Sequence, residues 1–199
     1  MKRLSMAAVL FLTALAGQAQ DESADSGAGF RVGAAAAFSD YSGDPSFPIE
    51  DSGLGVQIYA QAQLNKWFAA EVGYYNSGGF KSDIVNPLTR PSTGELEPVE
   101  LRLSGFNISA IGYLPLFQKS ETDIDLFLKV GLYDYDIDIT QTVSNSNLKT
   151  SLGHSTGFLV GGGAVLNVSE SIGIRASVDW YDIDNADLWA LGLGAEFQF

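Results

Sequence analysis

The chain has 199 residues, enough for one domain, with no cysteine and a formal net charge of −13. The absence of cysteine excludes disulfides, thiolate zinc sites and lipid attachment through an N-terminal cysteine. The strong negative charge excludes nucleic acid as a partner, because phosphates would be repelled. No apolar run in the sequence reaches the ~18–20 residues that a membrane-spanning helix requires.

The N-terminus, residues 1–19, has the pattern of a secretory signal. A basic start, an apolar stretch and small residues favour cleavage after Ala19, with Ala16 as the alternative. A short buried helix is the other interpretation of this segment. Removal of the signal would take the formal net charge from −13 to −15, because two basic residues leave with it. We expect a flexible mature N-terminus over residues 20–28, followed by one domain over 29–199.

From residue 29 onward, apolar residues alternate with small or polar residues, which is the period-2 pattern of β-strands. The pattern predicts eight strands, over residues 29–39, 53–64, 67–76, 100–114, 123–140, 153–166, 171–182 and 188–199. In the fourth strand, Leu101 and Leu103 have the opposite parity from Phe106. A bulge near Ser104–Gly105 would reconcile them.

The predicted connections differ at the two ends of the strands. Short or medium turns are predicted at 65–66, 115–122 and 167–170, whereas longer links are predicted at 40–52, 77–99 and 141–152, with a short last link at 183–187. Short turns at one end and longer loops at the other are typical of an outer-membrane barrel, whose short end is periplasmic. We call these the short-turn end and the loop end.

The second face of the strands distinguishes a barrel from a soluble sandwich. The solvated face of a sandwich usually carries Lys, Glu and Thr, whereas here it is mostly Gly, Ala, Ser and Gln. Small residues suit the narrow interior of an eight-stranded barrel. We therefore predict an all-β fold, a closed, eight-stranded antiparallel up-and-down transmembrane β-barrel.

Aromatic residues gather near both ends of the predicted strands, as expected at the two lipid–water interfaces of a barrel. The group near the short-turn end is Phe30, Trp67, Phe68, Tyr113, Phe117, Phe197 and Phe199. The group near the loop end is Phe38, Tyr41, Tyr74, Tyr75, Tyr133, Tyr135, Trp180, Tyr181 and Trp189. We interpret both groups as girdles that face lipid.

Six charged residues fall within the predicted spanning segments, on the face of small residues. They are Arg31, Glu71, Lys129, Arg175, Asp179 and Glu196. Arg31 and Glu196 lie on strands that become neighbours when the barrel closes, and Glu71, Lys129 and Arg175 lie at similar heights. Because an unpaired buried charge costs several kcal/mol, we predict that these side chains form ion pairs in the interior. Scattered solvent-exposed charges are the alternative.

The last nine residues are Leu-Gly-Leu-Gly-Ala-Glu-Phe-Gln-Phe. They end in Phe199, and apolar residues, including Leu193 and Phe197, occupy every second position before it. This ending resembles the assembly signal of bacterial outer-membrane proteins. The resemblance implies that the barrel-assembly machinery recognises the C-terminal strand through these three residues.

The C-terminal third, from Gly157–Phe158 through the Gly161–Gly163 triplet and Arg175, also resembles the OmpA/OmpX-type family of eight-stranded outer-membrane barrels. The resemblance implies a location in the bacterial outer membrane, with membrane lipid and lipopolysaccharide as partners. Because no segment follows the predicted eighth strand, we expect no peptidoglycan-binding domain.

Two patterns in the sequence are candidates for chemistry. Barrels that deacylate lipid A use a Ser, a His and an acid. In this sequence His154 is present, but Thr156 stands where the family pattern would place Ser, and no acid follows on the same face. The acidic run 182–187 lacks the loop glycine and the terminal Glu of a calcium-binding EF-hand. We therefore expect no catalytic residues, no metal and no cofactor.

The sequence favours a protein with a structural, envelope-integrity or surface-interaction role and without catalysis, whose outer loops could bind surface ligands. Acidic residues near the loop end suggest bridging to lipopolysaccharide through divalent cations. A narrow channel for small solutes and a lipid A-modifying enzyme are the alternatives.

Overall fold

The computed structural model describes residues 29–42, 50–82, 99–117, 123–143, 146–183 and 186–199. The predicted signal and the stretch 20–28 lie outside these residues. The strands are β1 (Gly29–Ser42), β2 (Glu50–Gln63), β3 (Phe68–Asn76), β4 (Phe80–Ser82), β5 (Val99–Phe117), β6 (Asp123–Val143), β7 (Ser146–Asn167), β8 (Ile172–Ile183) and β9 (Ala186–Gln198). No helix within the described ranges is long and apolar enough to cross a membrane.

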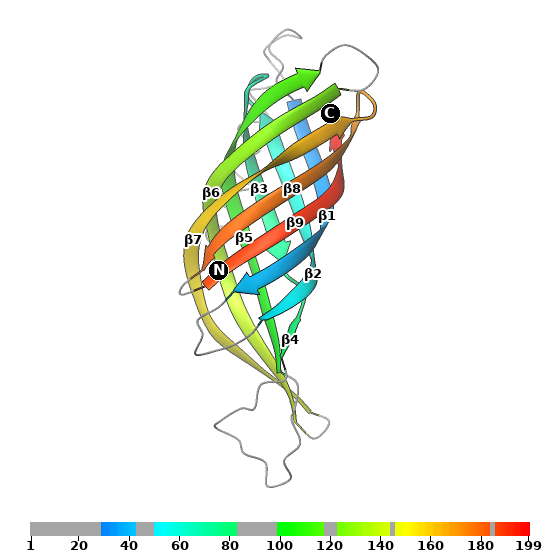
Figure 1. Ribbon diagram of the computed structural model, residues 1–199. Helices are drawn as coiled ribbons and strands as arrows, with labels where there is room; N and C mark the ends of the chain where they lie inside the picture. Colours follow the sequence, from blue (N-terminus) through cyan, green and yellow to red (C-terminus); the bar gives the residue numbers. More distant parts are fainter. Residues whose placement is uncertain (1–28, 43–49, 83–98, 118–122, 144–145, 184–185) are drawn as a thin grey trace.

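The strands form one closed antiparallel wall, so the predicted fold class is confirmed (Figure 1). Consecutive strands pair with each other except β3 and β4, which both pair with β5, and β1 pairs with β9 to close the wall. β4 continues the line of β3 along β5, so the two together form one of the eight barrel strands. Closure leaves the spanning wall without a sheet edge.

The bulge predicted at Ser104–Gly105 is wrong. β5 keeps one register with β6 from Val99 to Pro115. Leu101 and Leu103 point into the barrel, where they are 5% and 1% exposed. The sequence pattern assumes that apolar residues face outward, but the interior is apolar at the loop end, so these two leucines face inward.

The irregularity lies on the neighbouring strand, between β3 and β4. Asn76 pairs with Ser104 and Phe80 pairs with Leu101, so the chain advances four residues on this side and three on β5. The one extra residue is a bulge. Gly78 adopts φ +75°, a conformation that favours glycine. The backbone N–H of Leu103 donates to the Ser77 hydroxyl across this break.

The predicted link at 141–152 is also wrong. β6 extends to Val143 and β7 begins at Ser146, so most of this segment pairs within a long hairpin. Nine of its twelve residues are polar, without apolar residues at every second position, so period-2 alternation gives no signal for this segment. β5, β6 and β7 have 19, 21 and 22 residues and project beyond the other strands at the loop end (Figure 1).

The outward face of the wall is a belt of exposed apolar side chains. Leu128 is 73% exposed and Leu54 is 63% exposed, and comparable residues occur on every long strand. Contiguous apolar surface of this extent is rare on water-soluble monomers. The belt therefore fits a hydrocarbon solvent, with the polar face of each strand turned inward.

The expected aromatic girdles are only partly correct. Phe38, Trp67, Phe68, Trp189 and Phe197 are 42–60% exposed on the outward face. By contrast, five tyrosines of the predicted girdles lie in the interior and are at most 6% exposed. They are Tyr75, Tyr113, Tyr133, Tyr135 and Tyr181. Their odd-numbered positions place them on the inward face of their strands.

The inward orientation of Leu103 can be tested by comparison with Leu128. Leu103→Ala should lower the free energy of unfolding by about 2–5 kcal/mol, because it leaves a gap in a packed interior. Leu128→Ala should cost less, because lipid chains can fill the space. Urea unfolding in lipid vesicles, followed by tryptophan fluorescence, measures both. Equal losses would contradict the assigned faces.

Candidate functional site

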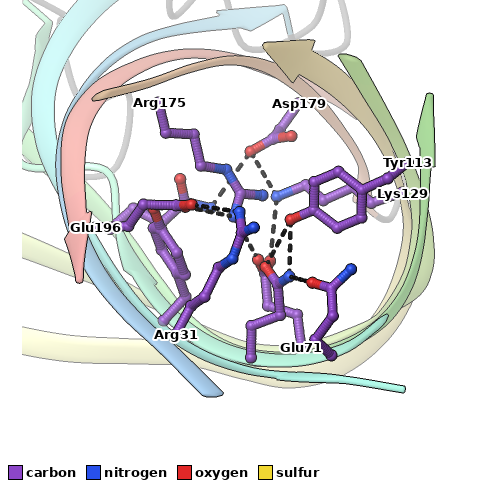
Figure 2. Close-up of polar contacts among 11 residues, drawn as sticks. Arg31, Glu71, Tyr113, Lys129, Arg175, Asp179 and Glu196 are labelled. Atoms are coloured by element: carbon purple, nitrogen blue, oxygen red, sulfur yellow. Dashed lines mark hydrogen bonds and ion pairs between the residues drawn. The ribbon is translucent and has the colours of Figure 1, made fainter. Parts of the chain in front are cut away.

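The six charged residues predicted to pair lie in the middle of the barrel, where their side chains converge from opposite walls (Figure 2). Three close ion pairs form, Arg31–Glu196 at 2.8 Å, Arg175–Glu71 at 2.8 Å and Lys129–Asp179 at 2.9 Å. Longer contacts of 3.6 Å from Lys129 to Glu71 and 3.9 Å from Arg175 to Glu196 join these pairs. The result is one continuous chain of charges, which we call the charged layer.

Aromatic rings support the charged layer, a role that the sequence reasoning missed. The Arg175 guanidinium lies between the rings of Tyr59 and Phe127, 4.4 and 4.2 Å from their centroids. Tyr59 also donates its hydroxyl to Glu196 at 3.0 Å. Cation–π contacts strengthen when the cation is desolvated. Strand parity alone would have placed these rings inside.

Two glycines make room for the charged layer. A Cβ on Gly33 would lie 2.3 Å from the Tyr59 ring, so only glycine allows Tyr59 to lie across β1. A Cβ on Gly161 would lie 2.1 Å from Asp179 Oδ1 and 3.0 Å from the Lys129 side chain. The glycine triplet of β7 therefore includes a position that admits the Lys129–Asp179 pair.

The loop-end half of the interior is filled by a packed cluster of tyrosines and aliphatic residues, which we call the tyrosine layer. Its largest members, Tyr75, Tyr133, Tyr135 and Tyr181, are at most 2% exposed. Ring centroids lie 5.0 Å apart for Tyr75–Tyr181 and 4.8 Å for Tyr133–Tyr181. Tyr75 also hydrogen-bonds Ser39. Together, the tyrosine and charged layers fill the lumen at two levels.

The short-turn half of the interior is filled as well. Gln61 donates to Tyr113 and to Gln63, at 2.7 and 3.2 Å. Ile111 and Val165 pack with Tyr113 in a small apolar cluster. The described interior residues thus fill the barrel from end to end.

His154 lies outside the barrel, on the outward face of the projecting β6–β7 hairpin. The sequence predicts no acid after His154 on the same face, but Asp134 and Asp136 of the neighbouring strand β6 lie 3.0 and 3.2 Å from its two ring nitrogens. The acids come from the paired strand, which a pattern within one strand does not show. The Thr156 hydroxyl donates to Asp134 at 3.3 Å. The cluster therefore links β6 to β7, and Asp134 binds both Thr156 and His154.

The acidic run 182–187 is only partly described, since residues 184 and 185 lie outside the described ranges. Asp182 and Asp187 are directly opposite each other across β8 and β9, and both are exposed. Asp187 accepts a hydrogen bond from the Trp180 indole at 3.0 Å. Within the described parts of the chain, no three His, Asp or Glu side chains are grouped to hold a metal ion.

The residues of the predicted insertion signal lie at the seam of the barrel. Leu193, Phe197 and Phe199 are 59%, 51% and 79% exposed. The N–H of Phe199 donates to the carbonyl of Phe30 at 2.8 Å, so the last residue pairs with the first strand. Their recognition by the assembly machinery stays a prediction.

The charged layer gives a direct prediction. Glu71→Gln should lower the free energy of unfolding by about 3–5 kcal/mol, because it leaves Arg175 and Lys129 with uncompensated buried charge. The matched control is Glu100→Gln, which breaks the exposed Glu100–Arg102 pair and should cost at most about 1 kcal/mol. Urea unfolding in lipid vesicles measures both variants. Similar costs would contradict the proposed importance of the layer.

The role of Gly161 can be tested with a second glycine as its control. Gly161→Ala should destabilise the barrel by about 1–3 kcal/mol, because the new methyl group displaces Asp179 from Lys129. A Cβ on Gly112 meets nothing within 4 Å, so Gly112→Ala should be neutral or slightly stabilising. The temperature at which the folded band is lost on a semi-native gel compares the two. A neutral Gly161→Ala would show that the pair does not need this space.

Comparison with known proteins places the chain in a family. The model of the outer membrane protein β-barrel domain matches residues 7–199. No curated protein matches the chain. Among solved structures, the attachment invasion locus protein Ail of Yersinia pestis, in complex with the heparin analogue sucrose octasulfate, is similar with a TM-score of 0.58 and 15% identity. The alignment covers 86% of this chain and 99% of Ail.

Two other solved barrels are similar to the same extent. Neisserial surface protein A has a TM-score of 0.56 and 18% identity, with 85% of this chain and 97% of that chain covered. OprG of Pseudomonas aeruginosa has a TM-score of 0.56 and 12% identity, with 87% and 97% covered. These identities establish the shared fold alone, whereas the family match covers nearly the whole chain. The chain therefore belongs to the outer membrane protein β-barrel domain family and is a bacterial outer-membrane protein.

Proposed function

We propose that this protein is a non-catalytic envelope protein that acts through surface contacts at its loop end. The observation that supports this function is the projecting β6–β7 hairpin. From Ser146 to Gly153, β7 pairs with β6, whereas β8 pairs with β7 only from Leu159 onward. An outer strand beyond the barrel wall offers backbone groups to an extended segment of another protein.

The edge of this hairpin also has features that restrict pairing. Lys149 is 64% exposed and contacts Asp138 at 3.0 Å, and the β6–β7 register shifts between Ile137 and Asp138. Charged residues and bulges at an edge discourage indiscriminate strand addition. A partner would therefore have to match the twist and charge of the hairpin as well as its backbone.

The filled lumen argues against the alternative of a narrow channel. A solute would have to pass both the charged layer and the tyrosine layer, whose side chains are nearly all inaccessible to solvent. Opening the charged layer would separate buried ion pairs, at a cost of several kcal/mol. These costs favour contact at the surface over transport.

The outward charge at the loop end narrows the class of partner. Its described carboxylates on the outward strand face include Asp40, Glu100, Asp134, Asp136, Asp138, Asp182 and Asp187. Arg102 and Lys149 contact Glu100 and Asp138, and the His154 imidazole contacts Asp134 and Asp136. A sulfated ligand such as the sucrose octasulfate bound to Ail would be repelled by this surface. We propose cationic surface ligands, and lipopolysaccharide phosphates bridged by divalent cations, as the partners.

The alternative of lipid A modification would use His154 and Thr156. A general base must accept the proton of the nucleophile, but the Thr156 hydroxyl donates to Asp134. We infer that the cluster holds the hairpin together and performs no chemistry.

The proposed role can be tested by shortening the hairpin. Replacing residues 139–150 with Asn-Gly joins Asp138 to Ser151, which are directly paired, through a two-residue turn. The variant should fold and reach the cell surface, because the deletion removes only the last β5–β6 pairs, at Val99–Leu101, and leaves the rest of the wall and the charged layer in place. Cells expressing it should lose attachment to protein-coated surfaces, because the projecting strand edge is gone. They should also lose the resistance to deoxycholate that wild type restores to a deletion strain.

Two outcomes would contradict the proposal. The shortened variant could support attachment and deoxycholate resistance as fully as wild type, which would place the function elsewhere. Alternatively, the purified wild-type protein could give discrete conductance steps in planar lipid bilayers that change in Glu71→Gln, which would favour a channel.

A further inference from the structure

The projecting edge of β7 lies directly in line with another strand of the wall. β8 pairs with β7 from Asn167 up to Leu159, whereas over the described residues from Ser146 to His154 β7 pairs with β6 alone. Figure 1 shows β6 and β7 continuing past the end of β8. A segment added to this edge would therefore continue the line of β8, as β4 continues the line of β3 along β5.

β8 ends close against β7 at a glycine. A Cβ on Gly157 would overlap the carbonyl oxygen of Asp182, so the last residues of β8 approach the β7 backbone closely there. Ile183 is directly opposite Ala186, because the chain turns back into β9 at this level. One end of an added segment would thus lie beside the β8–β9 turn, and the other end would lie near the tip of the hairpin.

The β8–β9 turn is flanked by two carboxylates. Asp182 and Asp187 are directly opposite each other and exposed, and the Trp180 indole donates to Asp187 at 3.0 Å. Like charges directly opposite in a ladder are destabilising. The ion pairs described at the loop end lie on β5, β6 and β7, and none of them includes either aspartate. A cationic group from another molecule would offset this repulsion.

The two carboxylates distinguish between the directions that an added segment could take. β7 runs from Ser146 at the tip of the hairpin down to Asn167. An antiparallel segment would therefore place its amino terminus next to Asp182 and Asp187, whereas a parallel segment would place its carboxyl terminus there. A terminal ammonium is attracted by the aspartates and a terminal carboxylate is repelled. Antiparallel pairing is also slightly more stable per residue, so both effects favour the same direction.

We propose that the β7 edge from Ser146 to His154 binds the free amino-terminal end of an extended polypeptide, with the terminal ammonium at Asp182 and Asp187. This inference rests on the proposed function, in which the hairpin is the recognition surface, and it adds the class of ligand and its direction. An internal segment of a chain has no terminal charge, so it would bind through backbone groups alone and more weakly. The register shift at Ile137–Asp138 increases the twist of the edge, which favours a short segment.

The inference can be tested by nuclear magnetic resonance titration of the full protein in lipid nanodiscs with two synthetic peptides. Both have about nine residues of alternating Thr and Gln, which is the length of the edge, and an amidated carboxyl terminus. They differ only in a free or an acetylated amino terminus. The free peptide should shift the backbone amide signals of Ser146–His154 and should bind about threefold more tightly than the acetylated peptide, as expected for an exposed ion pair.

Variants of the two aspartates show where the amino terminus binds. Asp182→Asn combined with Asp187→Asn should remove the difference between the peptides, while the edge signals still shift. The matched control combines Asp123→Asn with Glu170→Gln, which removes the same charge at the short-turn end and should keep the difference. Both aspartates of the site are exposed, so the variant should fold.

The outcomes separate this inference from the proposed function. Equal affinities of the two peptides for the wild-type protein would overturn the inference and leave recognition by the edge intact. A difference that persists without Asp182 and Asp187 would also overturn it, because the ammonium would then bind elsewhere. Absence of any shift along Ser146–His154 at millimolar peptide would contradict both the inference and recognition by the edge. If the double variant does not fold, the two peptides on the wild-type protein decide the question.

Discussion

The pairing of six buried charges inside a closed wall is the constraint on which the rest of the interior depends. Arg31 and Glu196 join β1 to β9 across the seam, while Lys129 connects β6 to β3 and β8 across the lumen. Buried ion pairs do not in themselves guarantee stability, because desolvation offsets their attraction. Their value here is geometric, since only one closed arrangement of strands brings all six together.

The surrounding residues accommodate this arrangement. Gly33 lets Tyr59 cover Arg175, and Gly161 admits Asp179 beside Lys129. A narrow barrel has room for long side chains only where facing positions are small. Gly73 follows the same rule, because a Cβ there would lie 2.9 Å from Asn107 Nδ2, so glycine admits the Asn107 side chain.

A filled lumen and a projecting hairpin locate the proposed function. Among the described residues, buried side chains occupy the lumen at two levels and the apolar belt fits lipid, which is why we place the proposed recognition at the loop end. There, the His154 cluster and the Lys149–Asp138 pair join β6 to β7 beyond the wall, and they make the hairpin a defined surface for recognition.

The sequence by itself determined the strands, their alternating faces and the six interior charges, because period-2 alternation and charge balance are local properties. It misassigned Leu101, Leu103 and Tyr133, and it missed the acids beside His154. These features depend on which strands become neighbours and on an interior that changes from charged to apolar along the axis. Only closure of the barrel decides both, since it brings together residues that are far apart in the chain.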